Sequence, residues 1–564
     1  MTTTEQLRPA VTSHTAEAAA RVDSAEAPEA AARRSRTAWS LGIVLVALSP
    51  LVVGGVSIIR RGFPPGALFG DRAILGLTAG DAWRAPVLLG PYSRFYWHHP
   101  GPLYFYALNV LSTVFGGGTV GLVLGTVAIN AAAVVGILVV ALRRGGRPLL
   151  VWTALLVTAY LVAIDPIPYD VWNPSVTVIP FVLVLLLAWS VMCRDWWATP
   201  WLVLVASFAV QTHVGLVPGV AMAVAWTVGL TVWRWRRRDL VRDDGDRRSV
   251  RGALLASTAV AFVVWLPPVI EELTSREGNL TALAHFFTRP GSPHTLSEGL
   301  HTAGLQATLI LRGVFAHVSL MADGQQGLTF ALVVSALAFG LALLGARRAR
   351  AADAQLLLAL VAVELVVGVY GVTKIVGPIQ YYVVQWISAV GFVLWFAVGA
   401  AGLEIARARG WSRSWSSAAR RGVVAVVVVV LCVSAVRAFP GHAGIINENL
   451  DVPNNRALFG YVPARQLLAA TRDGQTVVLR NDEPTAWEVL AADALLLEQH
   501  GRTVQIVESR ETQLLFDDAV LVRAAPPGAR VLSFRERSHA HPDGTDATLA
   551  HQGKWTIVAV HPGG

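Results

Sequence analysis

Charged side chains are scarce in this sequence. Only 15% of its 564 residues are Asp, Glu, Lys or Arg, whereas a typical soluble domain has about 25%. Lysine occurs only at Lys374 and Lys554, so the formal net charge of +9 comes from arginine, a composition resembling that of GC-rich actinobacterial genomes. The arginines lie in short loops between apolar runs, a placement that orients a membrane protein. We therefore predict no nucleic-acid partner.

Cysteine is equally rare. Cys193 and Cys432 are the two in the chain, and both lie in or beside apolar runs, which argues against a disulfide framework or a thiolate metal site. The C-terminal residues contain neither a glycine fingerprint for a nucleotide nor a cluster of metal ligands. We predict no metal and no cofactor, and leave a divalent metal open.

Long apolar runs, by contrast, recur from about residue 38 to 438. A helix needs ~20 apolar residues to span a bilayer, and these runs do not alternate as barrel strands do. We predict a polytopic α-helical membrane protein with about 11 transmembrane helices, interfacial helices and a small C-terminal α/β domain. The predicted spans are 38–59, 120–142, 148–164, 172–192, 200–212, 214–233, 252–270, 327–346, 354–373, 379–403 and 422–438.

The loops between these spans differ in charge. Four loops are rich in arginine, whereas the loops at 165–171 and around His213 carry no Lys or Arg and the loop at 374–378 carries one. Basic loops stay in the cytoplasm, so we predict a multi-pass protein of the plasma (inner) membrane with its N-terminus inside and its C-terminal domain outside. The basic loops are 143–147, 234–251, 347–350 and 407–421.

Composition predicts three regions. They are a disordered cytoplasmic tail at 1–37, a transmembrane domain at 38–438 with long outer loops at 60–119 and 271–326, and an extracytoplasmic α/β domain at 439–564.

Two apolar segments need interpretation. As one helix, residues 200–233 would be ~50 Å long, so we predict a hairpin that turns at "QTHVG" and places His213 at membrane depth. An ionisable group there faces a bundle interior or a water-filled cavity; a histidine that is simply hydrogen-bonded in the bundle is the alternative. Residues 102–117 carry polar side chains on one helical face, which predicts a surface helix rather than a span.

The first outer loop concentrates acids, cations and aromatic rings. Asp71 and Asp81 lie about ten residues apart, and the stretch "GPYSRFYWHHPGPLYFY" follows at 90–106. Arginine and protonated histidine suit a phosphate, whereas carboxylates and aromatic faces suit a sugar. Two structural alternatives remain: the rings form an interfacial aromatic belt, and Asp71 caps a helix beginning at Arg72.

An early aspartate after the first span, then "HPGPLYFY" opening a helix that ends in "FGGG", resembles the GT-C superfamily of membrane glycosyltransferases. The similarity is to the protein O-mannosyltransferase and aminoarabinose-transferase branches and covers about residues 60–192, including "DVWNPSVTVIPF" at 170–181. The chain departs from the pattern at Gly101, which separates two prolines, and at Arg72, where a second acid is common.

The resemblance implies transfer of a sugar from a polyprenyl-phosphate donor, with inversion, to an extracytoplasmic glycan, lipid or protein. Asp71 would be the general base. The implied phosphate ligands are Arg94, His98, His99 and Lys374, and the further candidate substrate contacts are Asp81, Tyr96, Trp97, His213, Gln380 and Tyr381.

Other functions remain open at this stage. A transporter or flippase would use intramembrane charges, and Glu364 lies in the middle of a span, but no internal repeat of the kind such proteins show is visible. A non-catalytic lipid-binding scaffold is a third possibility. For Lys374, a lysine that extends to the membrane interface is the structural alternative.

Overall fold

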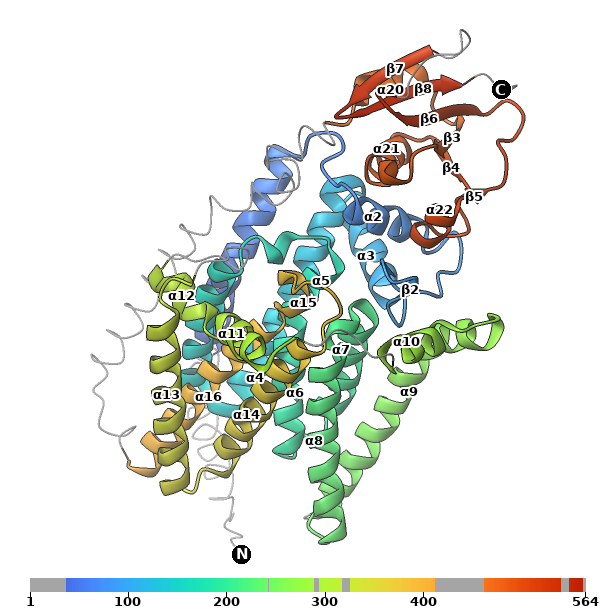
Figure 1. Cartoon of the computed structure of the whole chain (residues 1–564). Coiled ribbons are helices and arrows are strands. Elements are labelled where there is room, and N and C mark those ends of the chain that lie inside the picture. Colours follow the sequence, from blue (N-terminus) through green and yellow to red (C-terminus); the bar gives the residue numbers. More distant parts are fainter. Residues whose placement is uncertain are drawn as a thin grey trace, which may run out of the picture.

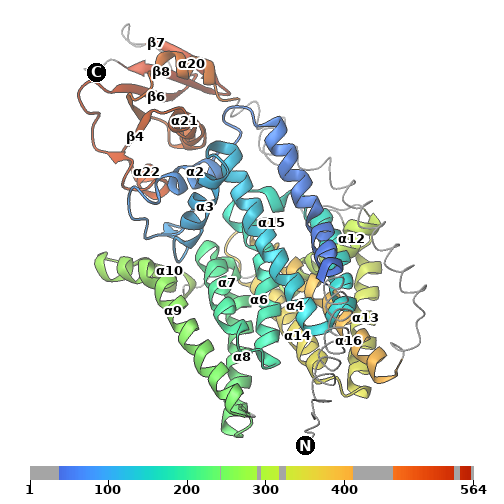
Figure 2. The same ribbon diagram turned by 180° about the vertical axis from the view of Figure 1, so that it is seen from behind.

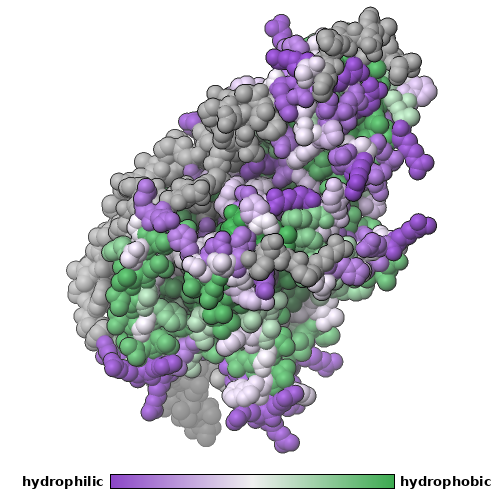
Figure 3. Space-filling model, viewed as in Figure 1, coloured by the Kyte–Doolittle hydropathy of each residue, from purple (hydrophilic) through white to green (hydrophobic). Residues whose placement is uncertain are grey.

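The computed structural model describes residues 37–241, 243–288, 294–316, 325–410, 461–538 and 547–560. Eight of the described helices are long and apolar enough to cross a membrane: Thr37–Arg61, α4 (Gly118–Ala163), Asn173–Met192, Val214–Arg236, α9 (Asp244–Thr274), α13 (Leu328–Arg348), α14 (Ala352–Thr373) and Tyr381–Ala408. They form a bundle below the C-terminal domain (Figure 1). In the space-filling view, hydrophobic residues cover the middle of this bundle and hydrophilic residues gather at both ends (Figure 3).

Within these spans the chain is divided into shorter helices. Asn173–Met192 consists of α5 (Asn173–Val176) and α6 (Val178–Met192), and Val214–Arg236 ends in α8 (Val217–Arg236). Tyr381–Ala408 consists of α15 (Tyr381–Val384) and α16 (Ile387–Ala408). Ten of the eleven predicted spans fall on described helices, which confirms the predicted fold class; the predicted tail before residue 37 and the predicted span 422–438 lie outside the described residues.

Helix α4 contains two of the predicted spans. It is 46 residues long and is broken at Gly146, whose φ of 70° and ψ of −159° are not helical. Glycine tolerates this left-handed φ without steric cost. The break lies in the basic loop 143–147, so the helices on either side correspond to the predicted spans 120–142 and 148–164.

The predicted hairpin within residues 200–233 is also confirmed. Helix α7 (Ala198–Thr212) ends at His213, which is extended at φ −150° and ψ 114°, and α8 begins at Val217. The 15 residues of α7 correspond to ~22 Å at 1.5 Å per residue, shorter than the ~30 Å hydrocarbon core.

Contacts between loops define the two ends of the bundle. The arginine-rich loops lie together at one end, where their side chains pair with acids from neighbouring loops, and Arg407 donates to the carbonyl of Gly145 over 2.7 Å. The ion pairs at this end are Arg143 with Asp195, Arg144 with Asp353 and Arg194 with Asp239. The bundle therefore has one basic end.

The opposite end holds the first outer loop. It contains α2 (Asp71–Asp81), a two-stranded hairpin of β1 (Tyr92–Ser93) and β2 (Trp97–His98), and α3 (Leu103–Val114). The 12 residues of α3 are too short to span a bilayer. Asn109 on α3 donates to the carbonyl of Ala79 over 2.6 Å and so ties α3 to α2.

The second long loop is largely helical. The described part contains α10 (Asn279–Thr288), α11 (Leu296–Ala307) and α12 (Leu309–Ala316). Figures 1 and 2 both show α10 at one flank of the bundle and α12 on the opposite flank beside α13. Figure 1 shows β2 next to α10, and the two elements are in contact. This arrangement brings residues 271–288 against the first outer loop.

The C-terminal domain is a mixed six-stranded sheet in the order β5-β4-β3-β6-β8-β7. Strand β3 (Thr476–Asn481) pairs in parallel with β4 (Thr503–Val507) and β6 (Arg530–Glu536), whereas β8 (Trp555–Val560) pairs antiparallel with β6 and β7 (Ala547–Gln552). The remaining elements are α20 (Ala464–Ala470), α21 (Trp487–Gln499), α22 (Arg510–Leu515) and β5 (Leu521–Val522).

Helix α21 joins this domain to the end of the bundle that holds the first outer loop. It packs against α2, and its residues 489–497 are all buried. A Cβ at Gly76 of α2 would lie 2.9 Å from the side chain of Leu122 and 3.2 Å from that of Leu495, so glycine is what allows α2 to lie between α4 and α21. The start of α2, with Asp71, is thereby fixed under the C-terminal domain.

Candidate functional site

Asp71 is the first residue of α2, and its carboxylate binds side chains rather than the helix end. The preceding Gly70 is the N-cap, and no side chain caps this helix. The Asp71 carboxylate instead accepts hydrogen bonds from the Tyr92 hydroxyl and from Trp172 Nε1, the latter at 3.0 Å. The alternative that Asp71 serves as a helix cap is therefore wrong.

Arg72 pairs with a different acid. Its Nε and Nη2 donate to the two carboxylate oxygens of Asp170 over 2.6 and 2.8 Å, and its guanidinium lies 5.0 Å from the centre of the Trp172 ring. Asp170, 1% exposed, also accepts from Ser175 Oγ over 2.8 Å. A bidentate pair of this kind satisfies both buried charges, which explains why an arginine follows Asp71 in this chain.

The surroundings of Asp71 raise its pKa. Burial is the main cause, and it is opposed by the Tyr92 hydrogen bond and by the charge of Arg72. The pKa of Tyr92 is also raised, by burial and by the charge of Asp71, so its hydroxyl stays protonated and continues to donate. Asp71 is thus a carboxylate oriented by two donors while its neighbouring cation is bound to another acid.

A third acid comes from the C-terminal domain. Glu488, at the start of α21, lies close to Gly70: a Cβ there would be 3.6 Å from Glu488 Cγ. Burial and then the charge of Asp71 raise the pKa of Glu488 to about 7. The adjacent Trp487 places its ring edge-on to Tyr92, with 6.2 Å between the centroids. Sequence analysis missed Glu488 because nothing in its own helix indicates a contact more than 400 residues away.

The two predicted cations of the phosphate site, Arg94 and Lys374, lie at one loop, and Lys374 also lines a groove. The Arg94 guanidinium lies 5.0 Å from the centre of the Phe95 ring, and its Nη2 would be 3.7 Å from a Cβ at Gly377. The Lys374 ammonium lies 5.2 Å from the centre of the Tyr370 ring. Lys374 lines an apolar groove of about 690 Å³ between α11 and α14.

Of the two predicted histidine ligands, His99 is buried and His98 is half-buried, and the pKa values of both are lowered. Burial lowers the pKa of His98 to about 4 and lowers that of His99 well below its usual value. His99 Nδ1 accepts from the backbone N–H of Val214 over 3.0 Å, and its ring centre lies 4.9 Å from that of His213. Their phosphate-binding role stays a prediction, and at neutral pH it would depend on N–H donors rather than on charge.

Tyr381 lies close to the acids around Asp71, whereas Asp81 lies away from them. The Tyr381 ring centre is 6.3 Å from that of Trp172. Gln380 precedes it as the N-cap of α15. Asp81 is the last residue of α2 and pairs with the exposed Arg84 at 3.3 Å, ~15 Å along the helix from Asp71.

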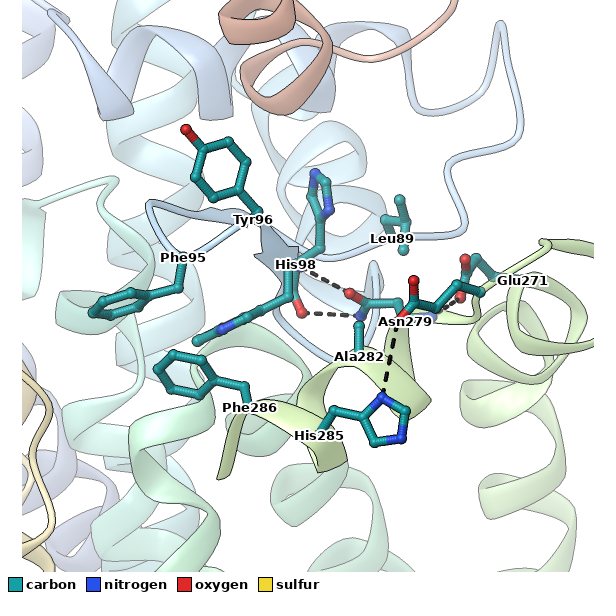
Figure 4. A pocket seen from close by; sticks show the side chains of 11 residues that line it. Leu89, Phe95, Tyr96, His98, Glu271, Asn279, Ala282, His285 and Phe286 are labelled. Atoms are coloured by element: carbon teal, nitrogen blue, oxygen red, sulfur yellow. Dashed lines mark hydrogen bonds and ion pairs between the residues drawn. The ribbon is translucent and has the colours of Figure 1, made fainter. Parts of the chain in front are cut away.

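Tyr96 and Trp97 line a cavity between the hairpin and α10 (Figure 4). Within the described ranges, no three His, Cys, Asp or Glu side chains gather as a metal would require. Glu364 is fully buried in α14, and neither of its carboxylate oxygens has a hydrogen-bond partner in the part of the chain that the structure describes.

Comparison with known proteins gives one informative similarity. No family model and no curated protein sequence matches the chain. The crystal structure of ArnT from Cupriavidus metallidurans bound to undecaprenyl phosphate matches with a TM-score of 0.50 and 16% identity, over 93% of this chain and 98% of that chain. At this identity the similarity shows the fold alone, which is like that of ArnT and agrees with the fold that the sequence resemblance implied.

Proposed function

We propose that this chain, which has an ArnT-like GT-C fold, is a membrane glycosyltransferase that takes a sugar from a polyprenyl-phosphate donor. A fold does not select a reaction, so the proposal depends on the site. Its main support is Asp71, a carboxylate that two side-chain donors orient while the adjacent arginine binds Asp170. The undecaprenyl phosphate bound to ArnT supports the donor class through the resemblance.

Asp71 acts as the general base. The acceptor hydroxyl gives its proton to Asp71 while its oxygen attacks the anomeric carbon of the donor sugar. The bond from that carbon to the phosphate oxygen breaks, and the lipid phosphate leaves with the electron pair. Attack from the face opposite the phosphate inverts the anomeric centre. Burial raises the pKa of Asp71, and a base with a higher pKa accepts a proton more readily once ionised.

Arg94 and Lys374 are the proposed cations for the departing phosphate. Negative charge grows on the phosphate as the sugar leaves, and positive groups that are already positioned stabilise it. Arg94 approaches the loop at residue 377, and Lys374 begins that loop above an apolar groove. An apolar groove that ends at a lysine suits a ligand with a hydrocarbon chain and an anionic head.

The reaction takes place on the extracytoplasmic side in this proposal. The arginine-rich loops meet at the end of the bundle opposite Asp71, and basic loops remain in the cytoplasm. The acceptor is then an extracytoplasmic glycan, lipid or protein, and the domain from residue 439 onward is extracytoplasmic. Glu488 brings that domain into contact with the site.

The test is transfer by the purified full-length protein in nanodiscs, using polyprenyl-phosphate donors that carry different radiolabelled sugars. We expect at least one donor to lose its sugar to an envelope-derived acceptor, with inverted configuration in the product. If every donor stays intact while lipid moves between the leaflets of proteoliposomes, the protein is a flippase and the proposal fails.

A further inference from the structure

The cavity between the β1–β2 hairpin and α10 shares no lining residue with the group of acids at the start of α2, which are Asp71, Asp170 and Glu488. Its volume is about 390 Å³, within the range of small-molecule sites. Figure 4 shows Phe95, Tyr96 and His98 on the hairpin side, and Asn279, His285 and Phe286 on the other side. None of the residues that line it bonds Asp71.

The walls of this cavity are firmly held. The backbone N–H of His98 donates to Asn279 Oδ1 over 2.8 Å, and Asn279 Nδ2 donates back to the His98 carbonyl over 2.9 Å. The Asn279 backbone N–H in turn donates to Glu271 over 3.0 Å, and Glu271 is 8% exposed. One asparagine thus joins the hairpin to α10.

One side of the cavity is aromatic and contains an unused donor. The Trp97 ring centre lies 5.4 Å from that of Phe286 and 6.2 Å from that of Phe95. Trp97 is 6% exposed, and its Nε1–H has no hydrogen-bond partner among the described residues. Leaving a buried donor unpaired costs free energy. Because the Nε1 atom is itself buried, a ligand that accepts this hydrogen bond has to displace a neighbouring ring to reach it.

Tyr96 is held in an unfavourable backbone conformation. Its φ is 65°, and its ring is 64% exposed. An L-residue with a side chain pays about 1–2 kcal/mol in this region, whereas glycine pays little. A tyrosine at a position that favours glycine indicates that the ring itself has a use, as strained residues at ligand sites often do.

The charges around the cavity favour a neutral ligand, because the carboxylates of Glu271 and Glu277 in its lining would repel an anion. Guanidinium groups of the protein already lie over two of its rings, Arg94 over Phe95 at 5.0 Å and Arg510 over Tyr96 at 5.4 Å, where they would repel a cation. Glu277 lies 3.8 Å from His285, and Glu271 already binds Asn279. The remaining acceptor oxygens, the indole N–H and the aromatic faces match a ring with C–H groups on its faces and hydroxyls at its rim.

We propose that this cavity binds a neutral pyranose of the sugar acceptor. This assignment rests on the proposed transferase function and adds the position of its acceptor. The hairpin supplies the connection: Tyr92, which holds Asp71, is directly paired with His98, which lines the cavity. A glycan bound here would place a hydroxyl of its adjacent sugar across the hairpin, toward Asp71.

The first experiment measures sugar binding without any donor. Saturation-transfer NMR on the full-length protein in nanodiscs would use methyl hexopyranosides as probes. We expect transfer to at least one pyranoside and about tenfold weaker binding in Trp97→Phe, which keeps a ring and removes one hydrogen bond. Trp83→Phe, at a tryptophan 67% exposed on the same loop, is the matched control and should bind as the unaltered protein does.

A second variant separates a loss of binding from a loss of folding. Tyr96→Gly relieves the left-handed φ, so its melting temperature should be equal or higher while pyranoside binding falls. Binding of tetramethylammonium in place of every pyranoside would overturn the proposal, and so would equal pyranoside binding by Trp97→Phe.

The transfer assay distinguishes this proposal from the function itself. With an active donor, Trp97→Phe should raise the acceptor KM and largely preserve kcat. An unchanged acceptor KM would refute the proposed acceptor site and leave the proposed transferase function intact. If the protein transfers no sugar but binds pyranosides in a way that depends on Trp97, the proposed transferase function is refuted and the cavity is a sugar-binding site only.

Discussion

Replacing Glu488 with glutamine should strengthen the docking of the C-terminal domain on α2, but only above about pH 5. The pKa of Glu488 is raised from 4.5 to about 7 by burial and by the charge of Asp71. The folded protein therefore holds this proton more tightly than the unfolded chain, and stability falls as the pH rises from 4.5 to about 7. The pKa difference of about 2.5 units, at about 1.4 kcal/mol per unit, gives at most about 3.5 kcal/mol.

Amide hydrogen exchange in α21 can measure this effect, because opening of the domain contact would return Glu488 to solvent. At pH 8, exchange of the buried 489–497 amides should be up to about two orders of magnitude slower in Glu488→Gln, after correction for intrinsic rates. At pH 4 the two proteins should exchange at the same rate, because the Glu488 carboxyl is then protonated whether the domain contact is closed or open. Equal protection at pH 8, or an equal gain at both pH values, would refute the reasoning.

Two further predictions concern the donor site and the orientation. Lys374→Met should weaken binding of a polyprenyl-phosphate donor about tenfold or more, because a hydrogen bond to a charged group contributes roughly 1.5–3 kcal/mol. The control Lys554→Met, at the other lysine, should bind the donor as the unaltered protein does. Unchanged donor affinity in Lys374→Met would show that Lys374 is an interfacial lysine only. Single cysteines at Arg84 and Arg348, introduced after the native cysteines are replaced, should react with an impermeant reagent from opposite sides of the membrane, and labelling of both from one side would exclude the proposed orientation.

The fold was largely predictable because membrane spans are specified locally. Run length gives each helix, arginine-rich loops give its ends, and the glycines of "RRGGR" mark the break in α4 at Gly146. The short arm before His213 was predictable for the same reason, since its length is fixed by the sequence between "DWW" and "QTHVG".

The partners of the candidate site were not predictable in this way. Asp71 was identified from its position after the first span, but the pairing of Arg72 with Asp170 joins residues 98 positions apart. Glu488 and Asn279 reach the first outer loop only through packing of α21 and α10. The sequence around each of these residues is that of an ordinary helix start, so it contains no sign of the contact.

Replacement of Asp71 with asparagine is the most direct test of the central claim that Asp71 is the catalytic base. Asparagine keeps one oxygen that can accept from Trp172, and its NH2 group replaces the oxygen that binds Tyr92, whose hydroxyl can accept in turn. The fold and donor binding should therefore be preserved, whereas proton acceptance is lost. General-base catalysis contributes ~10²–10⁴-fold, so sugar transfer should fall at least about 100-fold. Asp81→Asn, at the far end of α2, should transfer at a nearly normal rate. Near-normal transfer by Asp71→Asn would contradict the account.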